Sequence, residues 1–369
     1  MREGKSRRRG WIGAAVLALV LAGAFWGLRP HAQWTQPGPP AAAVPDASGP
    51  IDVQPPDVRA TAALAVGASL PDSDGIAAGA ALDAHFRRVL REGDPRQRLI
   101  ALRALAVGKR DARMRQWARA EAARLLAEAP DDPLIALAQG WFCRGAAPPC
   151  TPEELGAWES TEPGNAAALV DALGRARQSP EQQDILLRRM AAGGGYETHY
   201  RALVLETIAA FDNYVPPPPG SGELNALREA GLGTDTAARR QMLSTAYVAA
   251  LPLPPLTGIS NACRPPIPTQ RMRDCHAVLL RMARAHTLAE RMIAMSALER
   301  LTRGAPENLR WVAEVRRLRW WFQQLGSLLT GPAYWEDFMR HGEVEAVRRA
   351  LLRAGRPLDP PAGWQPLYR

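Results

Sequence analysis

The sequence predicts an all-α protein, and three observations support that prediction. Alanine, leucine, arginine and glutamate, which have high helix propensities, dominate the chain after its first 75 residues. Apolar side chains recur there at the three- and four-residue spacing of a helix face. Runs of alternating β-branched residues, the pattern of a half-buried strand, are absent. We expect helical hairpins packed as an irregular, solenoid-like bundle, preceded by an N-terminal transmembrane or signal helix.

The first 28 residues have the pattern of an export signal or a membrane anchor. Residues 1–10 form a basic region, and residues 11–28 form an uncharged apolar run of 18 residues. A run of that length just spans a hydrocarbon core of about 30 Å. Because the basic residues precede the run, the positive-inside rule places the N-terminus in the cytoplasm. We predict a single-pass protein of the bacterial inner membrane whose C-terminal domain is periplasmic.

Cleavage of this segment is the alternative interpretation. Ala22-Gly23-Ala24 fits the small-x-small pattern of a signal-peptidase site. Cleavage there would make Phe25 the first residue of the mature chain, with Trp26 next to it. Because Trp26 suits the interfacial belt of a membrane helix better, we favour an uncleaved anchor at residues 11–28.

A proline- and alanine-rich linker follows over residues 29–75. Its prolines recur among Ala, Gly, Ser and Asp without helical or alternating periodicity. Such a tract cannot build a core, and it extends by about 3.1 Å per residue. We expect it to hold the folded domain away from the membrane, which is more useful to an anchored protein than to a released one.

Residues 76–215 are expected to form a helical, repeat-like domain. Asp94-Pro95 and Asp132-Pro133 each place a capping aspartate before a proline at the first helical position. The helices expected here span residues 80–91, 96–107, 111–129, 133–142 and 166–176.

A proline-rich break at residues 216–219 separates this domain from a C-terminal helical subdomain at residues 223–369. A second break runs from residue 252 to residue 268. The last helices are expected at residues 269–286, 288–303, 306–328, 332–340 and 342–354. The tail, residues 355–369, contains four prolines, so we expect it to be extended, with Trp364 and Tyr368 packed on the bundle.

The repeat-like domain contains internal similarity. Leu99-Ile100-Ala101-Leu102 recurs 35 residues later as Leu134-Ile135-Ala136-Leu137. Over residues 94–195 the chain resembles tetratricopeptide-like repeats, which are helical hairpins of about 34 residues. With Leu99 taken as a core residue of the first helix, the residues at that family's Leu, small-residue, Ala and terminal Pro positions are Leu105, Ala106, Ala118 and Pro130. The family's aromatic positions are not matched, and helical hairpins of similar length in an irregular bundle are the other interpretation. The resemblance implies protein binding or scaffolding.

The four cysteines are expected to form two local disulfides. An even number of cysteines in an oxidising compartment favours disulfide pairing. Cys143 lies seven positions before Cys150, and Cys263 lies twelve positions before Cys275. Each bridge would join a loop to its neighbouring helix. We expect no zinc or haem site here, because the chain has no C-x-x-C sequence.

Catalytic and cofactor motifs are absent from the sequence. It contains no G-x-S-x-G, P-loop, H-E-x-x-H or G-x-G-x-x-G. His286 and Glu290 are spaced to share a helix face, and Glu197, His199 and Glu206 fall in one segment. Either set could supply part of a metal site or an acid–base pair. Ordinary surface pairing is the favoured interpretation, and we expect no metal and no cofactor.

One predicted helix has the composition of an interaction surface. Between residues 309 and 325, arginines flank an apolar stripe, and two tryptophans are adjacent. Adjacent residues on a helix are about 100° apart, so one tryptophan is expected to be partly exposed among the arginines, as in interface hot spots. The predicted Arg/Trp patch consists of Arg316, Arg317, Arg319, Trp320 and Trp321.

The charge balance argues against nucleic acid as a partner. Residues 1–32 hold six basic residues and one acidic residue, and setting them aside lowers the net charge from +9 to +4. A basic nucleic-acid footprint is much stronger than this. The sequence therefore favours a membrane-tethered periplasmic protein that binds a protein partner as a scaffold, assembly factor or inhibitor. The alternative is an exported all-α enzyme acting on cell wall or peptide substrates.

Overall fold

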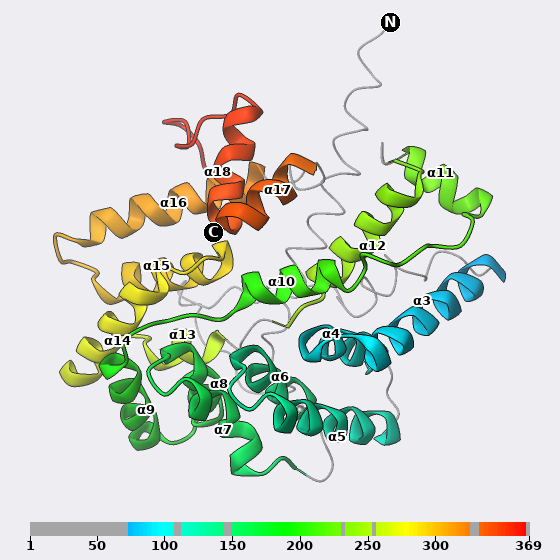
Figure 1. Cartoon of the computed structure of the whole chain (residues 1–369). Coiled ribbons are helices and arrows are strands. Elements are labelled where there is room, and N and C mark those ends of the chain that lie inside the picture. The colour runs from blue at the N-terminus through cyan, green and yellow to red at the C-terminus, as the bar shows by residue number, and fades with distance from the viewer. Residues whose placement is uncertain are drawn as a thin grey trace, which may run out of the picture.

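The computed structural model describes residues 73–106, 112–143, 149–229, 233–252, 256–324 and 332–366. Within these ranges the secondary structure is helical and contains no strand, which confirms the all-α prediction (Figure 1). The expected membrane segment, residues 11–28, lies outside the described residues. Among the described helices, none combines the length and the apolar character that crossing a bilayer needs.

The first group of helices runs from α3 to α9. Their bounds are α3 (Ser73–Glu92), α4 (Pro95–Ala106), α5 (Ala112–Glu128), α6 (Pro133–Cys143), α7 (Pro152–Thr161), the 3-10 helix η2 (Ala166–Leu169), α8 (Val170–Arg175) and α9 (Pro180–Ala192). Asp94 and Asp132 cap α4 and α6 as predicted, since their carboxylates accept hydrogen bonds from backbone N–H groups of the first turn. The aspartates therefore fix where these two helices begin.

The second group runs from α10 to α18. Its bounds are α10 (Tyr200–Ala209), α11 (Ser221–Glu229), α12 (Thr236–Ala249), α13 (Thr257–Ala262), α14 (Thr269–Met282), α15 (Leu288–Leu301), α16 (Asn308–Gln324), α17 (Pro332–His341) and α18 (Glu343–Arg353). The sequence placed the end of α14 at residue 286, but the helix ends at Met282. His286 therefore lies in the turn before α15, and the expected shared helix face of His286 and Glu290 is wrong.

The helices pack mainly as antiparallel neighbours. Contacts join α3 to α4, α4 to α5, α5 to α6 and α6 to α7 in chain order. The array continues from α9 to α14, from α14 to α15 and from α15 to α16, while α17 packs on α18. Figure 1 shows this array passing from α3 through the green helices to the orange and red ones. The expectation of packed helical hairpins is confirmed.

Helix α10 leaves the array and crosses the middle of the molecule (Figure 1). At its start, Arg201 donates a hydrogen bond to the backbone carbonyl of Met339 in α17. At its end, the carbonyl of Ala210 accepts a hydrogen bond from His85 Nε2 in α3 at 2.7 Å. Helix α10 thus connects the first helices of the array to the last ones.

The hydrophobic core extends along the same array of helices. A large buried cluster extends from α3 to α18, and a smaller one is enclosed by α4, α5 and α6. The rings of Phe86, Phe211 and Tyr247 pack where α3, the end of α10 and α12 meet, with centroids 5.3 Å apart for each pair. Burial of such rings supplies much of the hydrophobic stabilisation at a helix junction.

Candidate functional site

The structure joins the four cysteines in the predicted pairs. Cys143 and Cys150 form one disulfide with a Cα–Cα distance of 5.5 Å, and Cys263 and Cys275 form the other at 5.6 Å. Both distances lie near the most frequent value for disulfides. The first bridge links the end of α6 to Cys150, which directly precedes Thr151, the N-cap residue of α7. The second bridge links the end of α13 to α14.

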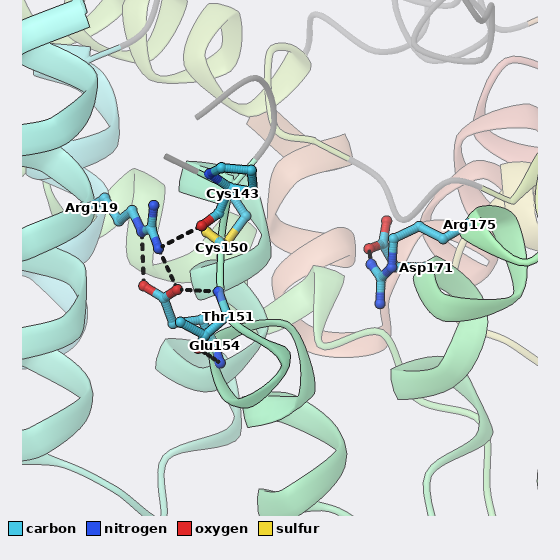
Figure 2. Close-up of a disulfide and its surroundings, with 8 residues drawn as sticks. Arg119, Cys143, Cys150, Thr151, Glu154, Asp171 and Arg175 are labelled. Carbon is cyan, nitrogen blue, oxygen red and sulfur yellow. Dashed lines mark hydrogen bonds and ion pairs between the residues drawn. A yellow bond between two sulfur atoms is a disulfide. The ribbon is translucent and has the colours of Figure 1, made fainter. Parts of the chain in front are cut away.

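Ion pairing fixes the segment beside the first bridge (Figure 2). Arg119 of α5 donates from Nε to Glu154 Oε1 of α7 at 2.8 Å and from Nη2 to the carbonyl of Pro149 at 3.3 Å. Glu154 also accepts from the backbone N–H of Thr151, completing a capping box at the start of α7. The pKa of the Glu154 carboxyl is lowered, chiefly by the hydrogen bond from Arg119. These contacts hold the residues next to the first disulfide in place, which indicates a structural role for the bridge.

The Arg/Trp patch lies on α16, but its tryptophans are not exposed. Trp320 and Trp321 are 9% and 7% exposed, so the expectation that one is partly exposed is wrong. The physical reason is the C-terminal tail, which runs across this part of the helix. The indole N–H of Trp320 donates to the carbonyl of Pro357, and that of Trp321 donates to the carbonyl of Leu358, both at 2.8 Å.

The arginines of the patch also bind the tail. Arg316 Nη2 donates to the carbonyls of Pro361, Ala362 and Trp364 at 2.9, 3.2 and 3.2 Å. Arg317 Nε donates to Asp359 Oδ1 at 2.7 Å. Arg319 is half-buried on the same helix.

The end of the described tail adds an aromatic contact. As expected, Trp364 packs on the bundle, with its ring edge-on to Trp320 at a centroid distance of 5.6 Å. Its indole N–H donates to Gln323 Oε1 at 3.0 Å. Tyr368 lies outside the described residues. The patch is recognisable in the sequence but the segment that covers it is not, because nothing local in the sequence pairs the tail with α16.

A second constellation forms around the loop between α9 and α10. His199 of this loop donates from Nε2 to Glu162 Oε2, 2.7 Å away, and the same carboxylate oxygen accepts from Trp158 Nε1 at 2.8 Å. Burial raises the pKa of Glu162, but the hydrogen bonds from His199, Asn165 and Trp158 outweigh it, so the pKa lies below its ordinary value. His199 has φ 55° and ψ 17°, a left-handed backbone conformation that is uncommon for a side-chain-bearing residue.

Asn165 also holds this loop in place. Its Oδ1 accepts from the backbone N–H groups of Ala167 and Glu197 at 3.1 and 3.0 Å, and its Nδ2 donates to the Glu197 carbonyl at 2.7 Å. The Glu197 carboxylate pairs with His286 Nε2 at 3.5 Å, while Glu206 pairs with Arg96 at 3.7 Å elsewhere. The structure thus brings Glu197 close to His286 but separates Glu206 from both.

Two acidic side chains, the buried Glu290 and the half-buried Glu343, lie at the N-terminus of α15. Glu290 is 1% exposed, and its Oε2 accepts from the Thr287 hydroxyl at 2.5 Å. Glu290 Oε1 and the hydroxyl oxygen of Tyr196 are both buried and lack a hydrogen-bond partner among the described residues. Glu343, the first residue of α18, accepts from the backbone N–H of Leu288 at 2.8 Å.

Burial dominates the ionisation of these groups. The pKa of Glu343 is raised to about 7, chiefly by burial and in smaller part by the nearby Glu290, against the hydrogen bond from Leu288. Burial also raises the pKa of Glu290 and of the Tyr196 phenol. The helix N-terminus favours a negative charge at this position, but burial disfavours it. A pair of carboxyls with raised pKa values can store protons or act as acids.

Only part of this constellation was predicted from the sequence. Glu197, His199, His286 and Glu290 were candidates there, whereas Glu162 and Glu343 were not, because their partners are 37 and 55 residues away. No sequence signal pairs residues at that separation. Within the described ranges, His, Cys, Asp and Glu form no group of three or more able to hold a metal ion.

Comparison with known proteins does not assign the chain to a family. It matches no protein-family model, no curated protein and no solved structure.

Proposed function

We propose that this chain is a protein-binding helical scaffold, assembly factor or inhibitor, anchored in the bacterial inner membrane by residues 11–28, with its folded domain in the periplasm. The observation that carries the proposal is the contact between α16 and the tail. There, side chains of the Arg/Trp patch hold the chain's own C-terminal segment through its backbone carbonyls. A surface with this donor set suits protein binding.

Two further features support the proposal. Consecutive helical hairpins give a long array of helices, and the tetratricopeptide-like resemblance of residues 94–195 points to the same class of protein. The two disulfides suit an oxidising compartment such as the periplasm.

The test is cross-linking in intact cells, followed by recovery of the full-length chain from membranes. We expect one protein to be recovered reproducibly with the chain, and to bind it again when both are purified. The matched control is the same anchor and linker, residues 1–75, fused to an unrelated periplasmic domain. Recovery of the same protein with the control, or no direct binding between purified proteins, would contradict the proposal.

An exported enzyme acting on cell wall or peptide substrates is the second candidate function. The observation that favours it is the buried Glu290 carboxyl, whose Oε1 and the neighbouring Tyr196 hydroxyl lack partners among the described residues. A carboxyl with a raised pKa is a suitable general acid. Incubation of the full chain with purified cell-wall sacculi and with casein tests this function. Release of products that is lost in Glu290→Gln would support it, and no release would contradict it.

A further inference from the structure

We propose that the Cys143–Cys150 disulfide is a site of reversible thiol–disulfide exchange in the folded protein, and that it reacts with a dithiol reductant. The Cys263–Cys275 disulfide stays closed under the same conditions. The inference goes beyond the proposed function, because it assigns a reaction to the chain itself, in addition to the structural role of the first bridge.

The two bridges differ in their access to solvent. Cys143 and Cys150 are half-buried, and both chain neighbours of Cys150 are exposed. Cys263 and Cys275 are 1% and 0% exposed and belong to the main hydrophobic core. Exchange requires a thiolate to reach a disulfide sulfur. The first bridge can therefore be attacked in the native state, whereas the second can be attacked only when the core opens.

The stability that each bridge contributes does not separate the two. Both close short loops, with sequence separations of 7 and 12 residues, so the chain-entropy model gives them similar contributions. The difference between them is therefore one of rate. The buried bridge must wait for an opening of the core, which is rare in the native state, whereas the half-buried bridge needs no such opening.

Other contacts hold both sides of the first bridge, so its reduction leaves the fold intact (Figure 2). Arg119 of α5 donates to Glu154 of α7 and to the carbonyl of Pro149. The capping box between Thr151 and Glu154 fixes the first turn of α7. On the other side, α6 packs on both α5 and α7. Reduction therefore removes the covalent link between α6 and α7 and leaves the two helices packed.

The exchange is a two-step reaction. A thiolate of the reductant attacks one sulfur of the bridge and forms a mixed disulfide, while the bond between Cys143 and Cys150 breaks with its electron pair on the other sulfur, which takes up a proton. The second thiol of the reductant then loses its proton and attacks the mixed disulfide, which releases the remaining cysteine as a thiolate that is protonated in turn. The bridge is thus reduced by two electrons to two thiols, and the dithiol is oxidised to a disulfide.

The experiment treats the folded, oxidised full chain with dithiothreitol and blocks the thiols formed with N-ethylmaleimide at successive times. Peptide mass spectrometry then gives the rate for each cysteine pair. We expect Cys143 and Cys150 to be labelled at least about a hundredfold faster than the buried pair, because the buried pair requires an opening of the core. The circular dichroism of the helices should not change while the first pair is reduced. Removal of dithiothreitol and addition of oxidised glutathione should close the same pair again.

Unfolding the chain is the control for access. In concentrated urea the two pairs should react at rates within about threefold of each other, because every sulfur is then open to the reductant. The variant Cys263→Ser with Cys275→Ser should keep the fast reaction, and Cys143→Ser with Cys150→Ser should lose it. If a paired variant does not fold, the unaltered chain still gives both rates in one sample.

Three outcomes would overturn the inference. The first is equal rates for the two pairs in the folded chain, which includes no reduction of either. The second is reduction of the first bridge only together with loss of the helical signal. The third is crossed pairing after oxidised glutathione is added. The proposed function is tested separately, since a partner recovered by cross-linking would support it whichever of these results was obtained.

Discussion

The carboxylate of Glu343, at the start of α18, accepts a hydrogen bond from the backbone N–H of Leu288, the first residue of α15. Two helices that are far apart in the chain thus meet through one half-buried acidic side chain. Glu290 of α15 lies near enough to raise the pKa of Glu343 further. This junction gives the fold a pH-dependent element.

The contribution of Glu343 to the stability of the folded domain should fall as the pH rises from about 4.5 to about 7. The folded pKa of Glu343 is about 7, whereas its ordinary value is 4.5. In that window the folded chain holds a proton that the unfolded chain has released, so the free energy of unfolding decreases with pH. We expect Glu343 to account for a decrease of no more than about 3 kcal/mol. Urea unfolding at pH 5 and pH 8 measures it.

The matched variant for this prediction is Glu343→Gln. Glutamine keeps an oxygen that can accept from Leu288 but does not titrate, so the pH-dependent decrease should be smaller than in the unaltered chain. Other groups, including the buried His85, remain in both proteins and cancel in the comparison. Equal pH dependence of the two proteins would show that Glu343 does not change its ionisation on folding.

Local features of the fold were predictable from the sequence, whereas contacts between distant segments were not. Asp94 and Asp132 could be identified as caps because a cap acts on the next few residues. The disulfide pairs were also local, with cysteines seven and twelve positions apart. By contrast, the burial of Trp320 depends on Pro357, 37 residues away. Helical periodicity identifies the face of a helix but not the segment that covers it.

Asn165→Ala should destabilise the folded domain by about 2–3 kcal/mol, as expected for an N-cap lost together with part-buried hydrogen bonds. Asn165 caps η2 and binds both the N–H and the carbonyl of Glu197. Its loss would leave these groups without that partner and release the loop that carries His199. Thermal and urea unfolding measure the change. Asn225→Ala, at an exposed position on α11, is the control and should stay within about 0.5 kcal/mol of the unaltered chain.

Removing either disulfide should lower the free energy of unfolding by about 2–3 kcal/mol on the chain-entropy model. The bridges close short loops, of seven and twelve residues, so the two effects should be similar. The paired variants are Cys143→Ser with Cys150→Ser, and Cys263→Ser with Cys275→Ser. Peptide mapping of the unaltered chain without reduction should recover both pairs. Four free thiols or any crossed pairing would contradict the structure.

The last prediction concerns topology. If residues 11–28 remain in the membrane, a periplasm-dependent reporter such as alkaline phosphatase, fused after Arg369, should be active, and the chain should stay in the membrane fraction after a carbonate wash. Because disulfides form in the periplasm and not in the reducing cytosol, the same fusion should contain both bridges. Deleting residues 1–28 should leave the reporter inactive and the four thiols reduced. A mature protein whose N-terminal sequence begins at Phe25 would instead establish cleavage, and the anchor would not exist.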